Sequence, residues 1–370
     1  MAVYRIFPEK DTFISSEVPT GNAGKDEIIE IGGYSDTTGL GETNRILVQY
    51  STSEIQDVIA NKVGAATYSA SLNLYLADAY EIPVNYNLYA YPVYGAWDNG
   101  VGKFGDIPTN TTGVSWQYKL AGETGAWTTT GFVVNTTGSY LSGSTAGGGN
   151  WYTGSNGVNL EFTQSHGLNS TNDVSINVTE AIKLFTTGAI ANNGFILKLP
   201  NSLEYSTTSS IRLKYYGVDT NTIYPPSLEF KWDDSTYSTG SLSVLSNSIS
   251  IINLTNNKGN YVDNGKQRFR LSARPKYPVR SFTTSSAYLT NYALPSASYW
   301  GLRDENTEEM VVNFDTKFTK ISCDSNGAFF DVYMDGLQPE RYYRILVKTT
   351  LDGSTTVVDN QNIFKVVRNG

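Results

Sequence analysis

The chain has 370 residues, a formal net charge of −8 and one cysteine. A negative chain lacks the clustered lysines and arginines that extended binding to nucleic acid needs, which excludes that class of partner. The single Cys323 excludes an internal disulfide and any cysteine-rich zinc site, and we expect it buried and reduced. No stretch approaches 18 apolar residues and charges interrupt the N-terminal segment, so we expect neither a membrane span nor a signal peptide.

The length exceeds what one hydrophobic core usually serves, so two domains are expected. Only 17% of residues are charged, and Gly, Ser, Thr, Asn and Tyr are frequent, which favours strands and turns. Residues 1–239 carry 12 basic and 23 acidic groups, whereas residues 240–370 carry 15 and 12. This asymmetry predicts polar head-to-tail contacts between neighbouring copies, although two separately solvated surfaces explain it equally well.

In the first 235 residues, apolar side chains alternate with polar ones at a period of two, which predicts half-buried strands. Two short segments have helical spacing instead, and the second one is followed by the stop signal Gly188. Between about residues 99 and 157 the sequence is rich in Gly, Thr and Ser but keeps tryptophans, which indicates a long excursion from the sheets. In chain order, the predicted elements are helix 53–62, strand 71–76, the excursion, strand 174–178, helix 178–187, and strands 211–215 and 228–232.

A Ser/Thr/Gly-rich stretch follows Trp232, so we predict domains at residues 1–235 and 236–370. Strands are predicted in the second domain at residues 267–273, 310–314, 329–334, 341–349 and 355–358. Asp352-Gly353 between the last two predicts a tight hairpin turn. Many short strands separated by turn residues must cover their apolar faces with a second sheet, so the predicted fold class is all-β, with two successive sandwiches.

Short motifs follow one another in a characteristic order over residues 7–232. They are Asp11-Thr12-Phe13-Ile14, Asn22 with Gly24, Arg45-Ile46-Leu47-Val48, Leu72-Asn73-Leu74-Tyr75, Trp97, Val114-Ser115-Trp116, Val178-Thr179-Glu180, Asn193-Gly194-Phe195-Ile196-Leu197 and Pro226-Ser227-Leu228. This order resembles the carbohydrate-binding-module-like jelly rolls called DNRLRE domains. The resemblance implies a jelly-roll sandwich, although Ile211-Arg212-Leu213-Lys214 stands where that family has a polar Arg/Glu signature.

In the second domain, Leu337-Gln338-Pro339 is followed by Tyr343-Arg344-Ile345. This spacing is similar to the tyrosine corner of fibronectin type III domains, and it implies an immunoglobulin-like or fibronectin-like sandwich. Tyr343 is then the corner tyrosine, with its hydroxyl bonded to nearby backbone. An ordinary strand after a proline turn is the alternative.

The opening Met-Ala-Val-Tyr-Arg-Ile-Phe-Pro, the jelly-roll pattern and the Phe-Lys-Val-Val-Arg ending together resemble virion structural proteins of contractile-tailed bacteriophages that infect marine bacteria. The resemblance implies a structural or adaptor protein of the tail, baseplate, neck or capsid decoration, assembled in the host cytoplasm. Its partners are then other virion proteins and copies of itself, bound through protein–protein interfaces.

Catalytic chemistry finds little support in the sequence. The one histidine, His166, has no cysteine near it, and phosphate-binding loops and nucleophile elbows do not occur, so we expect no enzyme and no cofactor. A polysaccharide depolymerase stays open as an alternative, because its two carboxylates need no fixed sequence spacing. A structural calcium ion on Asp324, Asn326 and Asp331 also stays open, although these residues lack EF-hand spacing.

Two groups of residues are candidates for binding. Trp116, Trp127 and Trp151, in or beside the Gly/Thr-rich sequence, could stack on sugars of a host-surface glycan, and packing beneath the excursion is the favoured alternative. The second group is a basic run without an acidic residue: Lys266, Arg268, Arg270, Arg274, Lys276 and Arg280. We predict that it docks an acidic neighbour, and a solvated basic strand is the alternative.

Overall fold

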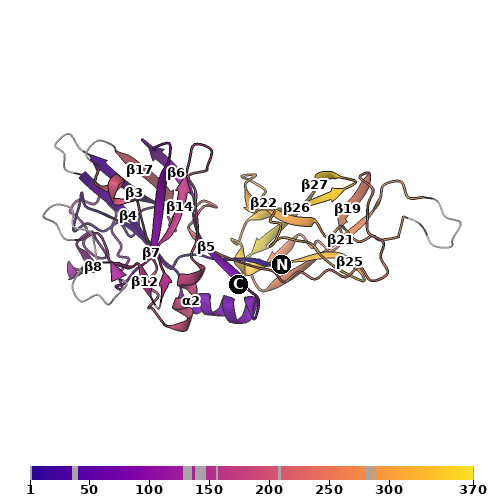
Figure 1. The fold of residues 1–370 in the computed structure, drawn as a ribbon, viewed down its shortest axis with the longest axis horizontal. Coiled ribbons are helices and arrows are strands. Elements are labelled where there is room, and N and C mark those ends of the chain that lie inside the picture. The colour runs from indigo at the N-terminus through magenta and orange to yellow at the C-terminus, as the bar shows by residue number, and fades with distance from the viewer. Residues whose placement is uncertain are drawn as a thin grey trace. The chain divides into compact units, whose positions relative to one another are not determined.

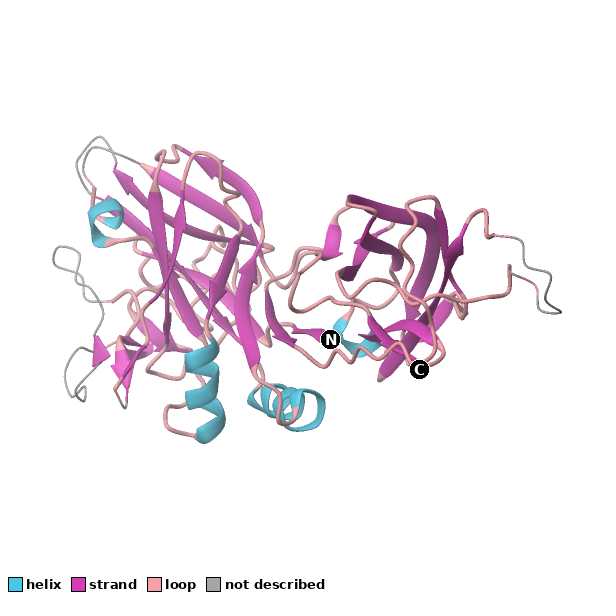
Figure 2. Cartoon of the chain, turned by 45° about the vertical axis from the view of Figure 1, so that its right-hand side comes forward, coloured by secondary structure: helices cyan, strands magenta, loops and turns pink. Residues whose placement is uncertain are grey.

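The computed structural model describes residues 2–35, 41–127, 136–137, 147–155, 157–206, 210–279, 286 and 288–369. The chain is predominantly β-structure, which confirms the all-β fold class (Figures 1 and 2). It divides into two compact units. The N-terminal unit is Ile6–Lys62 with Ser69–Glu229, and the C-terminal unit is Phe230–Gly370 with Met1–Arg5 and Val63–Tyr68. The sequence-based division at residue 235 placed Met1–Arg5 and Val63–Tyr68 in the first domain. Their contacts place both segments in the C-terminal unit.

Two sheets contain the main strands of the N-terminal unit. An eight-stranded sheet has the order β14-β7-β16-β4-β3-β17-β6, with β2 also paired to β4, and a four-stranded sheet has the order β1-β18-β5-β15. In the smaller sheet, nearly all of β1 and the second half of β18 are counted with the C-terminal unit. The strands are β1 (Ala2–Ile6), β2 (Lys10–Ser15), β3 (Ile28–Ser35), β4 (Gly41–Gln49), β5 (Tyr68–Leu74), β6 (Leu76–Tyr80), β7 (Tyr86–Pro92), β14 (Phe162–His166), β15 (Val174–Asn177), β16 (Phe195–Lys198), β17 (Ile211–Tyr216) and β18 (Ser227–Trp232). Strands β15 and β17 confirm the predicted alternation, since their apolar positions are buried and their polar positions are not. The predicted strand 71–76 is divided, because β5 ends at Leu74 and Leu76 begins β6, and in β18 the polar Glu229 is buried together with the apolar residues.

Helices are short connectors in this unit, as their spacing predicted. Helix α1 (Thr52–Asp57) continues as a π-helical turn, η1 (Val58–Val63), and α2 (Thr179–Thr187) ends at Gly188, which has φ +71°. The left-handed conformation at Gly188 is what a helix stop requires. A third helix, α3 (Asn201–Glu204), follows Pro200 and is too short to leave a periodic signal in the sequence.

The excursion packs onto the large sheet instead of hanging free. Its described part forms only short strand pairs, β8 (Tyr118–Leu120) with β9 (Thr124–Ala126), β10 (Thr136–Thr137) with β11 (Trp151–Tyr152), and β12 (Gly154–Ser155) with β13 (Val158–Asn159). Gly147 and Gly148 have positive φ, and added Cβ atoms would lie 2.3 Å from the Trp116 carbonyl oxygen and 2.5 Å from Arg45 Nη1. The triple glycine therefore permits a close approach to the sheet.

Beneath the excursion lies a buried charge cluster, defined here as Arg45, Lys198 and Glu204. Arg45 Nε and Nη2 lie 3.0 and 2.8 Å from the two carboxylate oxygens of Glu204, and Lys198 Nζ lies 3.0 Å from Glu204 Oε2. The Arg45 and Glu204 side chains are fully buried, and Lys198 is nearly so. Burial lowers the pKa of Lys198 to about 8, although the Glu204 carboxylate acts in the opposite direction.

The C-terminal unit is an immunoglobulin-like sandwich. Its sheets have the orders β19-β21-β25-β24 and β20-β27-β26-β22-β23. The elements are β19 (Ser250–Leu254), β20 (Asn260–Val262), β21 (Lys266–Pro275), β22 (Ser298–Asp304), β23 (Met310–Val312), β24 (Ser322–Asp324), β25 (Gly327–Tyr333), the 3-10 turn η2 (Met334–Gly336), β26 (Tyr342–Leu351) and β27 (Ser354–Val367). Lettered A to G along the chain without β20 and β23, the first sheet reads A-B-E-D and the second contains G-F-C, the immunoglobulin arrangement.

Three details of this unit support the arrangement, and the sequence predicted the last two. Trp300 of β22 is buried and stacks on Phe330 at 5.1 Å between ring centroids. The Tyr343 hydroxyl donates to the Gln338 carbonyl oxygen at 2.8 Å, which confirms the predicted tyrosine corner. Asp352 and Gly353, with φ of 49° and 73°, form the tight β26–β27 turn, as the Asp-Gly pair predicted.

Replacing Tyr343 with phenylalanine should lower the free energy of unfolding of the C-terminal unit by about 1–2 kcal/mol, because the Gln338 carbonyl loses its donor in a buried corner. Urea unfolding curves measure the change. Tyr342→Phe is the matched control, since Tyr342 is half exposed and its ring contact with Lys365 survives the substitution. Equal stability of the two variants would contradict a stabilising role for the corner hydroxyl.

Candidate functional site

One face of the large sheet carries a polar and aromatic surface formed by β3, β17 and β6. These strands are neighbours, and in the register Arg212 lies between Tyr80 of β6 and Gly32 of β3. One step along, Lys214 lies between Asp78 and Glu30. The intervening apolar residues of β3 and β17 are buried, so alternation turns these polar side chains toward solvent.

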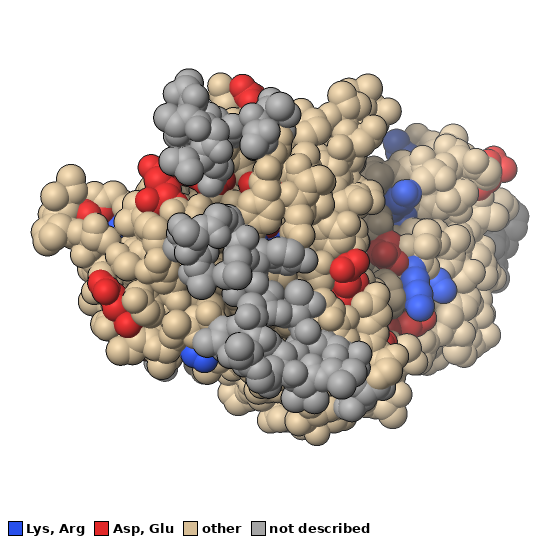
Figure 3. All heavy atoms as spheres, turned by 60° about the vertical axis from the view of Figure 1, so that its left-hand side comes forward, with Lys and Arg blue, Asp and Glu red and all other residues tan. Residues whose placement is uncertain are grey.

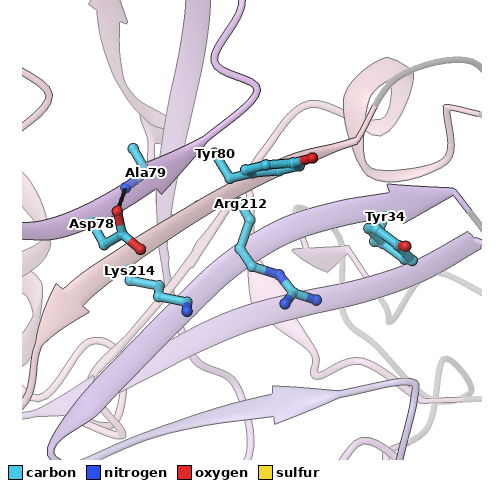
Figure 4. A pocket seen from close by; sticks show the side chains of 6 residues that line it. All are labelled: Tyr34, Asp78, Ala79, Tyr80, Arg212 and Lys214. Atoms are coloured by element: carbon cyan, nitrogen blue, oxygen red, sulfur yellow. Dashed lines mark hydrogen bonds between the residues drawn. The ribbon is translucent and has the colours of Figure 1, made fainter.

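The side chains of this surface enclose a hollow of about 300 Å³ (Figure 4). We call the six residues that line this hollow the tyrosine surface: Tyr34, Asp78, Ala79, Tyr80, Arg212 and Lys214. The two rings flank Arg212 in the close-up view. Tyr80 is 58% exposed and Tyr34 is 38% exposed, so both rings offer area to a ligand.

Arg212 is held in place at the centre of the hollow. Its Nε lies 2.8 Å from Glu30 Oε1, and its guanidinium carbon lies 5.5 Å from the centre of the Tyr34 ring. Asn44 Nδ2 donates to the same Glu30 oxygen at 2.6 Å. Burial raises the pKa of Glu30, and the charge of Arg212 partly offsets this. Glu30 and Asn44 therefore position the arginine from beneath.

Lys214 and Asp78 supply charges of opposite sign at the rim. Asp78 accepts a hydrogen bond from the following backbone amide of Ala79 at 2.9 Å. Within the described residues, the Lys214 ammonium makes neither an ion pair nor a hydrogen bond. With Arg212 and Glu30, the surface thus combines two positive groups, two negative groups and two aromatic rings, which suits non-covalent binding of a neutral, hydroxyl-rich molecule.

The tryptophans predicted as glycan candidates do not form a surface. Trp116, Trp127 and Trp151 are at most 2% exposed, so no ring face is open to a sugar. Trp116 and Trp151 pack against the Arg45 guanidinium, whose carbon lies 4.9 and 5.5 Å from the two ring centres. These tryptophans are packed beneath the excursion, as the favoured alternative predicted. The close approach of the glycines brings the excursion over them.

The first half of the basic run is neutralised within the chain. Arg268 forms a two-bond ion pair with Asp331 at 2.8 and 3.0 Å, and Lys266 lies 3.3 Å from the same carboxylate. Arg270 binds Asp324 in the same way, at 3.0 and 2.8 Å. The prediction that these three residues await an acidic partner is corrected here, because antiparallel pairing brings the carboxylates of β24 and β25 to them.

The second half of the run lies beside exposed apolar side chains in the described parts of the segment between β21 and β22, residues 276–279 and 288–289. Arg274 and Lys276 lie over the Tyr288 and Tyr277 rings at 5.2 and 5.6 Å, and neither forms an ion pair within the described residues. We call the following set the loop tip: Tyr277 (72% exposed), Val279 (89%), Tyr288 (58%) and Leu289 (85%), with Arg274 and Lys276. Arg280 lies outside the described residues.

The three residues considered for calcium are engaged otherwise. Asp324 and Asp331 bind the arginines described above, and Arg270 lowers the pKa of Asp324. Asn326 donates its backbone amide to Asp324 at 2.9 Å. Among the described residues, no three His, Cys, Asp or Glu side chains gather as metal ligands would. In the same part of the chain, no helix has the length and hydropathy of a membrane span.

Sequence reasoning missed the tyrosine surface because its members are far apart in the chain, at positions 34, 80 and 212. A signal existed in the alternation Ile211-Arg212-Leu213-Lys214, which places two cations on the solvent face of one strand. Figure 3 shows one face of the molecule, on which the charged side chains are few and most of the described surface is uncharged.

Comparisons with known proteins do not assign this chain to a family. No protein-family model matches the sequence, and a search of curated proteins found no match. Among solved structures, a DUF4785 family protein from Legionella pneumophila aligns over 98% of this chain with 8% identity and a TM-score of 0.17. The chain spans 66% of that protein's length. A likeness this low supports no argument about fold or function.

Proposed function

We propose that this chain is a structural or adaptor protein of a tailed bacteriophage particle, in the tail, baseplate, neck or capsid decoration. It assembles in the host cytoplasm and acts through contacts with other virion proteins and with copies of itself. The observation that carries the proposal is the loop tip, since the sequence resemblance alone does not say which surface would bind. Four large apolar side chains on one loop are more than half exposed.

Exposed apolar side chains of this size are unfavourable in water unless a partner covers them, and clustered ones mark protein interfaces. Tyrosine and arginine are the residue types that most often dominate binding energy at such interfaces. The two cations at the tip favour an acidic partner. Residues 1–239 of a neighbouring copy, with 23 acidic and 12 basic groups, supply one.

The double substitution Val279→Ser and Leu289→Ser should lower the amount of this protein in purified particles at least tenfold, because the two most exposed apolar side chains of the loop tip are lost. Quantitative mass spectrometry of particles, with the melting temperature of the free protein as a check on folding, measures this. Val84→Ser is the control, since Val84 is 64% exposed but lies outside the loop tip. Absence of the unaltered chain from particles, or equal incorporation of the variant, would contradict the proposal.

A further inference from the structure

The geometry of the tyrosine surface points to a second activity, and we infer that it is a binding subsite for a neutral oligosaccharide. The subsite lies on β3, β17 and β6 of the N-terminal unit and uses none of the buried tryptophans. It goes beyond the proposed assembly role, which rests on the loop tip.

The aromatic rings provide the first argument. Tyr80 and Tyr34 stand on either side of Arg212 with their rings exposed (Figure 4). The ring faces are apolar and electron-rich, so they favour the C–H faces of a sugar ring, while the phenol hydroxyls remain able to hydrogen-bond. Tyrosine has few rotatable bonds, so fixing it against a ligand costs little conformational entropy.

The polar groups provide the second argument. Arg212 and Lys214 donate hydrogen bonds, and Asp78 accepts them, so neighbouring hydroxyls of one sugar find both kinds of partner. Arg212 is already fixed by Glu30, which Asn44 holds in turn, and the groups stand on paired strands. A site fixed before the ligand arrives loses less entropy on binding.

The charge balance selects among hydroxyl-rich ligands. Arg212 is already paired with Glu30, and Lys214 lies opposite Asp78 on the neighbouring strand, so the hollow offers a phosphorylated or sulfated glycan no excess of positive charge. A neutral sugar meets no repulsion. The hollow of about 300 Å³ is at the lower end of small-molecule pockets, so it fits a short stretch of a glycan chain.

The test is calorimetric titration of the full chain with neutral hexasaccharides of glucose, mannose, galactose and N-acetylglucosamine, with sulfated dextran as the anionic comparison. At least one neutral hexasaccharide should bind with a Kd near or below about 1 mM. Tyr80→Ala and Tyr34→Ala should each weaken that binding roughly tenfold through loss of stacking. Tyr277→Ala, which removes an even more exposed tyrosine from the C-terminal unit, should leave the binding unchanged.

Three results would overturn the inference: no neutral hexasaccharide binds, sulfated dextran alone binds, or both tyrosine variants bind as well as the unaltered protein. Circular dichroism shows that each variant is folded before its result is used. The assay also separates this inference from the assembly role. The loop-tip double variant should keep its sugar binding, and Tyr80→Ala should still enter particles.

Discussion

Glu204→Gln should lower the free energy of unfolding of the N-terminal unit by about 3–5 kcal/mol, the largest loss we expect from a near-isosteric change. The carboxylate of Glu204 faces both Arg45 and Lys198 in a fully buried position. An amide keeps the shape but removes the negative charge, so two buried cations lose their counter-charge. Urea unfolding followed by tryptophan fluorescence measures the loss, and hydrogen exchange assigns the transition to this unit.

The matched control is Glu180→Gln, which breaks an ion pair with Lys183 whose two side chains are about half exposed. Solvent screening makes such pairs nearly neutral, so a change within about 0.5 kcal/mol is expected. The triple variant Arg45→Met, Lys198→Met, Glu204→Leu removes all three charges together and should be more stable than Glu204→Gln. A Glu204→Gln variant that matches the control would show that the cluster does not stabilise the unit.

Asp11→Asn should remove a pH dependence of stability in the same unit. Asp11 is 2% exposed, and burial raises the pKa of its carboxyl from 3.8 to about 7. Between these values the folded protein holds a proton that the unfolded chain has lost, so stability is greatest below about pH 4 and falls as the pH rises to about 7. Over this window the group accounts for up to about 4 kcal/mol.

The asparagine cannot ionise, and its amide oxygen can still accept the Val218 backbone N–H that Asp11 Oδ2 binds at 2.7 Å. The measurement is the difference in urea unfolding free energy between pH 5 and pH 8, which should be clearly smaller in the variant. Asp78→Asn, at an exposed position, should keep the full difference. If Asp11→Asn lost stability equally at both pH values, the ionised carboxylate would be the native form and the argument would fail.

Local sequence patterns predicted the all-β fold class and several of its elements, because the physics behind these patterns is local. Alternation identified β17, and the stop at Gly188 identified the end of α2. Spacing around Tyr343 identified the corner of the C-terminal unit. The Gly/Thr-rich composition predicted the excursion but not how it is held, since the glycines from Gly147 to Gly149 pack closely onto Arg45 and Trp116.

The candidate sites depend on contacts between distant residues, which one sequence does not display. Arg268 has no acid near it in the chain, but strand pairing places Asp331 opposite it. Tyr80 depends on a distant residue in the same way. Nothing in the sequence around it indicates a site, and only the pairing of β6 with β17 places it opposite Arg212. Composition indicates only that aromatic and basic residues are candidates for binding. Which of these residues are exposed depends on the pairing and packing of the strands.

The inclusion of Met1–Arg5 in the C-terminal unit sets an order for events on the ribosome. The Tyr4 ring contacts Tyr333 edge to face at 5.8 Å, so strand β1 meets a partner made more than 300 residues later. At the usual rate of about 5–20 residues per second, β1 waits roughly 15–65 s before that contact can form. The C-terminal unit therefore cannot be completed before the strand that contains Tyr333 is made, and residues 236–370 synthesised alone would lack strand β1.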